Sequence, residues 1–257
     1  MKKNSILASL ALLSAVIGNA IPNASATVVI SDDFTTGGPG RAVGDPLGGT
    51  TTPVGAATWI KGTTTTPTAG AAFTAANEVN NGGTYSTLAS VSLAGAGSLT
   101  GKTVTVQADV NFSGNNWGTI EFANVVGPTH DVFASSLLLY VEQKTGNWSI
   151  YNNNFGATIA SGKVTMLAGL NNLQLIYNAQ LNKASAWING VNVAPFFSLA
   201  YTPVLNYAGF GTYGTTGITD LTLTRVDNFV VDVVPEPSSI AMLGLGAMVL
   251  LYRRRRK

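Results

Sequence analysis

The sequence predicts an all-β domain, and two observations carry this prediction. Apolar and polar residues alternate with a period of two in many short segments, which is typical of strands with one buried face. Clusters of Gly, Asn, Ser and Thr separate these segments about every ten residues, and few windows show a helical period. Many short strands without intervening helices predict a β-sandwich or jelly roll.

The clearest strand covers residues 102–112, in which five apolar residues share one face: Val104, Val106, Ala108, Val110 and Phe112. The other predicted strands, in chain order, are residues 84–93, 119–123, 137–142, 148–152, 173–177, 184–188, 207–212 and 219–233. After residue 188, Asn189-Gly190 predicts a tight type I′ hairpin. Residues 164–170 are the one short segment compatible with a helix, and residues 35–76 predict a long loop or a loosely ordered edge.

Both ends of the chain differ in composition from this body. Lys2 and Lys3 precede an apolar run over residues 6–17, and Ala24-Ser25-Ala26 follows with small residues, which is the pattern of a secretory signal peptide. We expect signal peptidase to cut after Ala26, with Ala20 as the alternative. The signal peptide would then cover residues 1–26 and the sandwich domain residues 27–234.

The C-terminal segment 235–257 has three parts. Pro235-Glu236-Pro237 is followed by an uncharged stretch and then by five cations: Arg253, Arg254, Arg255, Arg256 and Lys257. The stretch between them would be about 22 Å long as a helix, short against the roughly 20 residues of a comfortable membrane span, and the cations would hold its end on the cytoplasmic side.

This order of parts resembles the PEP-CTERM sorting signal of Gram-negative bacteria, which an exosortase-type membrane protease reads. The resemblance implies export through the inner membrane, transient anchoring by a C-terminal hydrophobic sorting helix, and then a place at the cell surface or in the extracellular matrix. The alternative is a plain C-terminal membrane anchor. The resemblance concerns destination and does not extend to activity.

Without its two ends, the body carries seven basic and eleven acidic residues, a formal net charge of −4. No basic patch remains for binding nucleic acid, and we set that class of partner aside. The chain has no cysteine, which excludes thiolate metal sites and cysteine-based catalysis.

Three short stretches of the body resemble concanavalin-like, laminin-G-like jelly rolls. They are residues 172–190 with the Trp187-Ile188-Asn189-Gly190 turn, the opening Asp32-Asp33-Phe34, and the closing segment 227–231. The resemblance implies a jelly-roll β-sandwich whose terminal strands lie near each other. It also permits a structural Ca²⁺, because carboxylate and amide oxygens suit this ion. The predicted ligands are Asp32, Asp33, Asp227 and Asn228.

The sequence shows no hydrolase motif. Concanavalin-like glucanases carry closely spaced acids, whereas Glu121, Asp131 and Glu142 are each about ten residues apart. The single histidine, His130, stands beside Asp131; a solvated loop residue is the favoured interpretation over a general base or a metal ligand. We therefore predict a protein that is not an enzyme.

Aromatic residues among Asn-rich turns suggest sugar binding, because exposed rings stack on sugars and amides bond to hydroxyls. The candidate ligand-binding residues are Trp117, Trp148, Tyr151, Asn152 and Asn154, although Trp148 also suits a sandwich core. The predicted function is a surface or extracellular-matrix protein that binds carbohydrate and is associated with exopolysaccharide in a biofilm. A secreted glycoside hydrolase with Glu121 and Glu142 on one face, or a purely structural coat protein, are the alternatives.

Overall fold

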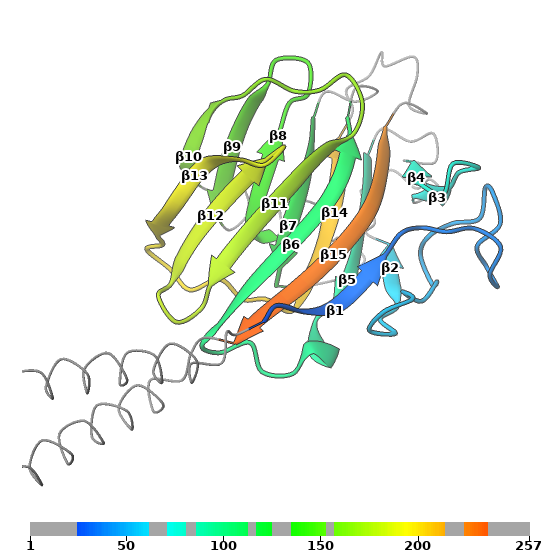
Figure 1. Ribbon diagram of the computed structural model, residues 1–257, viewed down its shortest axis with the longest axis horizontal. Helices are drawn as coiled ribbons and strands as arrows, with labels where there is room; N and C mark the ends of the chain where they lie inside the picture. Colours follow the sequence, from blue (N-terminus) through cyan, green and yellow to red (C-terminus); the bar gives the residue numbers. More distant parts are fainter. Residues whose placement is uncertain are drawn as a thin grey trace, which may run out of the picture. The chain divides into compact units, whose positions relative to one another are not determined.

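Two antiparallel β-sheets face each other across one hydrophobic core (Figure 1). The computed structural model describes residues 25–61, 71–80, 86–112, 117–124, 135–152, 157–213 and 224–235. One sheet has eight strands, with β1 (Thr27–Asp32) paired to β15 and the others in the order β13 (Val191–Ser198), β12 (Lys183–Ile188), β11 (Asn171–Asn178), β6 (Lys102–Asn111), β15 (Arg225–Pro235), β4 (Val79–Asn80) and β3 (Ala72–Phe73). The other sheet has seven, in the order β10 (Ala157–Lys163), β9 (Asn147–Asn152), β8 (Ser135–Val141), β7 (Trp117–Ala123), β14 (Tyr207–Tyr213), β5 (Ser86–Ser92) and β2 (Trp59–Lys61).

The predicted all-β sandwich is confirmed. The described residues contain no α-helix, only the single 3-10 turn η1 (Ala94–Ala96). Within the same ranges, no helix is long and apolar enough to cross a membrane. Residues Thr27–Val233 form one compact unit, and the pairing of β1 with β15 brings the two ends of this unit together, as the jelly-roll resemblance implied.

Alternating burial places the core between the sheets. In β6, Val104, Val106, Ala108 and Val110 are fully buried while the residues between them are half-exposed, as the period-two pattern predicts. The predicted Asn189-Gly190 hairpin joins β12 to β13: Ile188 pairs with Val191, and both turn residues have the positive φ that a type I′ turn requires.

Two edge strands and one loop differ from the expectations. β10 and β13 were not predicted, because β10 is largely exposed and has no apolar alternation, and β13 contains Pro195 and two irregularities of register. Each is held by pairing with its neighbour, β9 or β12. Residues 164–170 form an irregular loop and no helix. There the Asn171 side chain accepts a hydrogen bond from the amide of Leu167 at 2.8 Å and donates to the carbonyl oxygen of Gly169 at 3.0 Å, so local polar bonds replace helical ones.

The Gly- and Pro-rich segment after β1 is firmly attached to the core in its described part. Trp59 is 1% exposed and packs on Phe34, Phe210 and Phe229 with ring centroids 5.0–5.7 Å away. Asp32, also buried, accepts hydrogen bonds from Trp59 Nε1 at 2.8 Å and from both terminal nitrogens of Arg41 at 2.8 and 2.6 Å. The described residues of this segment are therefore an ordered edge rather than a loose one.

Candidate functional site

A diagonal row of aromatic side chains crosses three strands on the outer face of the seven-stranded sheet, the face turned away from the other sheet. Ile120, Leu139 and Ile150 point into the core, so by alternation Trp117, Tyr140 and Tyr151 point outward from β7, β8 and β9. Thr119 is paired with Tyr140, and Leu138 with Tyr151. Each ring of the aromatic row thus stands one diagonal step from the next, within reach of its neighbour.

The rings of the aromatic row touch each other at steep angles. The centroids of Trp117 and Tyr140 are 4.9 Å apart with 46° between the ring planes. Those of Tyr140 and Tyr151 are 6.0 Å apart in an edge-to-face arrangement at 86°. All three side chains are half-buried and keep part of their surface open to solvent.

Glu142 holds the centre of the row in place. Its carboxylate accepts hydrogen bonds from the Tyr140 hydroxyl at 2.7 Å, the Thr145 hydroxyl at 2.6 Å and the Asn147 amide at 3.0 Å. The bonds from Thr145 and Tyr140 lower the pKa of Glu142, so it is ionised at neutral pH. Burial, followed by the bond to Glu142, raises the pKa of Tyr140, so its hydroxyl stays protonated as a donor.

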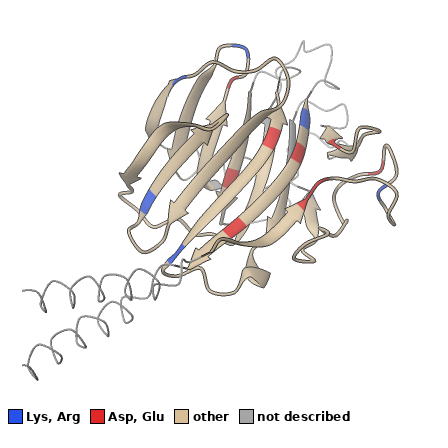
Figure 2. Cartoon of the chain, in the orientation of Figure 1, with Lys and Arg blue, Asp and Glu red and all other residues tan. Residues whose placement is uncertain are grey.

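Polar side chains are buried beside the row on the same outer face. Glu121 on β7 is fully buried, and so are Thr119 and Ser90, whose hydroxyls have no hydrogen-bond partner among the described residues. Strands β5, β7, β8, β9 and β14 contain no lysine or arginine. Acidic side chains also lie on β6 and β15 of the other sheet (Figure 2). The face that carries the aromatic row would therefore recognise a ligand by stacking and hydrogen bonding rather than by cations.

The predicted sugar-binding residues separate into different environments. Trp117 and Tyr151 belong to the aromatic row, whereas Trp148 is 6% exposed and points into the core against Gly162. Asn152 is half-buried at the end of β9, where its side chain accepts a hydrogen bond from the amide of Ala157 at 3.0 Å. Asn154, like His130, lies outside the described residues. Sequence reasoning missed Tyr140, although it stands in a predicted strand two residues before Glu142.

The carboxylates of the hydrolase alternative are far apart in register. Glu121 pairs with Leu138 of β8, and Glu142 lies four residues further along the chain from Leu138. At roughly 3.4 Å per residue this offset is about 14 Å along the sheet. The paired carboxyl groups of glycosidases stand about 5–10 Å apart. In addition, Glu142 is directed toward its own turn by Thr145 and Asn147.

Several of the predicted calcium ligands are engaged in other contacts. The Asp32 carboxylate is occupied by Arg41, Trp59 and the amide of Phe34, and the adjacent cation would repel Ca²⁺. Asp32 therefore does not fit a calcium ion. The Asn228 amide nitrogen is turned to Asp227 at 3.3 Å and to Asp109 at 2.9 Å. Within the described ranges, no group of three or more His, Asp or Glu side chains is arranged to hold a metal. Calcium at Asp33, Asp227 and Asn228 stays a prediction.

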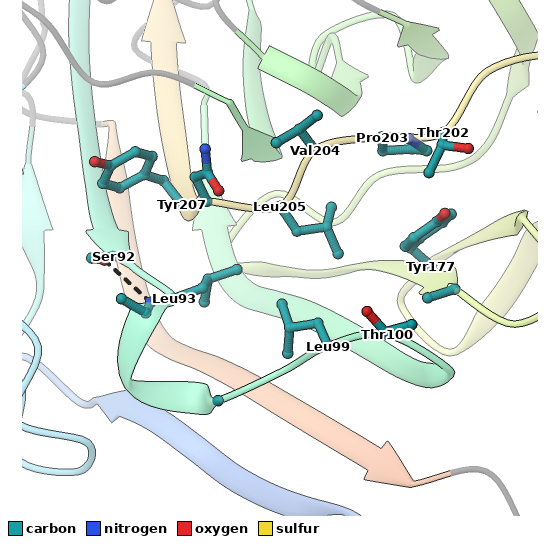
Figure 3. A pocket seen from close by; sticks show the side chains of 14 residues that line it. Ser92, Leu93, Leu99, Thr100, Tyr177, Thr202, Pro203, Val204, Leu205 and Tyr207 are labelled. Carbon is teal, nitrogen blue, oxygen red and sulfur yellow. Dashed lines mark hydrogen bonds between the residues drawn. The ribbon is translucent and has the colours of Figure 1, made fainter.

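A pocket of about 640 Å³ opens beside η1, where β5 ends and β14 begins. Leu93, Leu99 and Leu205 point toward one another there, with Tyr177 and Tyr207 on either side (Figure 3). Among the described residues, none of those that line this pocket is charged. Its size is within the range of small-molecule sites.

Comparison with known proteins identifies the C-terminal segment. The family model described as the PEP-CTERM protein-sorting motif matches residues 233–257, and the motif indicates an exported protein. Of its predicted residues, Pro235 is the last residue of β15, while Glu236, Pro237 and the four arginines lie outside the described part of the chain. No curated protein matches the sequence.

Solved structures show likeness of fold. A Trypanosoma rangeli sialidase is 16% identical with a TM-score of 0.51; the match covers 82% of this chain but only 31% of the sialidase chain. The carbohydrate recognition domain of Emp47p has a TM-score of 0.48 at 10% identity, covering 83% of this chain and 98% of that domain. Arcelin-5, a lectin-like defence protein from Phaseolus vulgaris, has a TM-score of 0.49 at 9% identity, and the match covers 68% of this chain and 92% of the arcelin chain. The chain thus joins an all-β sandwich of two antiparallel sheets to a PEP-CTERM protein-sorting motif at residues 233–257.

Proposed function

We propose that this protein is an exported, non-catalytic polysaccharide-binding protein of the cell surface or extracellular matrix. The observation that carries the binding part is the aromatic row Trp117, Tyr140 and Tyr151. Three partly exposed rings on one sheet face offer apolar area to the faces of sugar rings, and the nearby Ser149 and Thr158 hydroxyls of β9 and β10 offer hydrogen bonds.

The wide spacing of Glu121 and Glu142 supports binding rather than hydrolysis, because a retaining or inverting glycosidase needs both carboxylates at one bond. The absence of lysine and arginine from the five strands around the row favours exopolysaccharide without a dense negative charge.

The proposal includes processing at both ends. Signal peptidase would remove residues 1–26, and an exosortase-type protease would act on segment 235–257 after transient anchoring, leaving the body 27–234 in the exopolysaccharide of a biofilm. The matched sorting motif supports the second step. The intact mass of the protein from cells and culture medium tests both: a species from near Thr27 to near Pro235 is expected, whereas a membrane species retaining the terminal arginines would favour a plain anchor.

The same protein samples test binding. In native gels that contain a soluble polysaccharide, we expect retardation by at least one neutral glucan. Trp117→Ala and Tyr151→Ala should each weaken this binding about tenfold, through loss of one stacked ring. Phe196→Ala is the matched control, because Phe196 is an aromatic residue 50% exposed on the other sheet. If all three variants and the unaltered protein were retarded equally, the binding site would lie outside the aromatic row. If no polysaccharide retarded the protein, the proposed binding function would be refuted.

A further inference from the structure

The angles between the rings of the aromatic row bear on the kind of polysaccharide that it fits. A crystalline polysaccharide presents a flat face, and rings that bind such a face must lie in one plane to stack on it together. The planes of Trp117 and Tyr140 differ by 46°, and those of Tyr140 and Tyr151 by 86°. No flat surface can meet two neighbouring rings of this row at once.

Two constraints keep the rings out of one plane, and a third fixes the position of the central ring. Neighbouring strands of a sheet are rotated against each other by roughly 20–25°, so β7, β8 and β9 present their side chains at different angles. Aromatic pairs in contact prefer tilted and edge-to-face arrangements. The Tyr140 hydroxyl is also bonded to the ionised Glu142; because the hydroxyl oxygen lies on the axis about which the ring turns, this charge-assisted bond fixes the position of the ring on the sheet rather than its plane.

Glu142 is itself held by its turn. The Thr145 hydroxyl and the Asn147 amide both donate to Oε2, while Tyr140 donates to Oε1. The support of the central ring is therefore present before any ligand arrives, and the angles belong to the free protein. Such prior ordering lowers the entropy cost of binding a ligand that matches the angles.

We propose that the aromatic row is selective for a single soluble glycan chain that bends between successive sugars, and that it rejects the flat faces of crystalline polysaccharides. This inference rests on the proposed function and specifies the ligand class of the same site. A bent chain can place successive sugars against rings that lie in different planes, whereas a flat fibre cannot stack on two neighbouring rings at once.

The test compares two forms of ligand with the full-length protein. Sedimentation with microcrystalline cellulose and with crystalline chitin measures binding to flat faces. Native gels with mixed-linkage β-glucan, dextran or starch measure binding to soluble chains. We expect retardation in at least one gel and at least about tenfold weaker binding to both crystalline materials, because only one ring can stack there.

The variants make the outcomes distinct. One contrary result is that the protein sediments with a crystalline polysaccharide, and that Trp117→Ala and Tyr151→Ala, but not Phe196→Ala, abolish this sedimentation. That result would overturn the selectivity and leave the binding function standing. Binding to neither form would overturn both. Retardation in the soluble gels alone, weakened in Trp117→Ala and Tyr151→Ala and unchanged in Phe196→Ala, supports the inference.

Discussion

Replacing Arg41 by methionine should be among the most damaging single changes in the described part of the chain. Arg41 donates to both oxygens of Asp32 and to the carbonyl oxygen of Thr51 at 2.7 Å, and its guanidinium lies 5.1 Å from the centre of the Phe73 ring. Methionine keeps an apolar stem of similar length but removes the charge and all three bonds. The Asp32 carboxylate, 1% exposed, would keep only Trp59 and the Phe34 amide as donors.

Leaving one partner of a buried ion pair uncompensated costs about 3–5 kcal/mol, against a total stability of about 5–15 kcal/mol. Urea unfolding followed by tryptophan fluorescence measures this loss. Arg225→Met is the comparison: Arg225 is 43% exposed and its contact with the 11% exposed Glu78 side chain is 3.4 Å long, so the loss should be smaller, about 1–2 kcal/mol. If Arg41→Met lost no more than Arg225→Met, the argument that this buried pair anchors the segment after β1 would be refuted.

Two further changes test the packing and the charges of the sandwich. Gly118→Ala would drive a Cβ into the ring of Phe112 between the sheets and should lower the free energy of unfolding by about 1–3 kcal/mol. Gly95 has open space around it, so Gly95→Ala should change the free energy of unfolding by less than about 0.5 kcal/mol. Similar losses for the two variants in chemical denaturation would contradict the packing at Gly118. Burial, together with Glu78, Asp109 and Asp33, raises the pKa of Asp227 from 3.8 to about 6. The folded state therefore binds a proton more tightly than the unfolded state, and stability falls as pH rises from about 4 through 6. Asp227→Asn should remove this fall and add about 1 kcal/mol at pH 7 after allowing for solvent screening, and an unchanged stability–pH profile would rule out this role.

The strands that could be predicted are those whose burial shows in their own residues. β6 and β11 lie in the middle of their sheet and alternate strictly, so their inward faces follow from period two alone. β10 has no such pattern, because it is an exposed edge strand defined by its pairing with β9. The short strands β2 and β4 pair with the distant β5 and β15, and β3 pairs with the nearby β4; strands of two or three residues leave little signal in a local window.

The candidate site was predictable only in part for a similar reason. Trp117, Trp148 and Tyr151 all appeared as aromatics near polar turns, and Trp148 was also compatible with a core position. The burial pattern of β9 places Trp148 with Ile150 on the inward face and Tyr151 on the outward face. Tyr140 joined the row because β8 lies between β7 and β9, which no local feature of residues 137–142 indicates. Asp32, predicted as a calcium ligand, pairs instead with a cation from a segment that looked like a loop.

The sequence by itself determined the all-β class, the inward faces of the central strands, the Asn189-Gly190 hairpin and the C-terminal sorting motif. Each of these depends on residues close together in the chain: a period of two, a turn dipeptide, or a linear motif. The tertiary structure alone decided the Asp32–Arg41–Trp59 contacts and the aromatic row. These depend on which strands become neighbours and in which register, and that is set by the joint burial of both sheets rather than by any single segment.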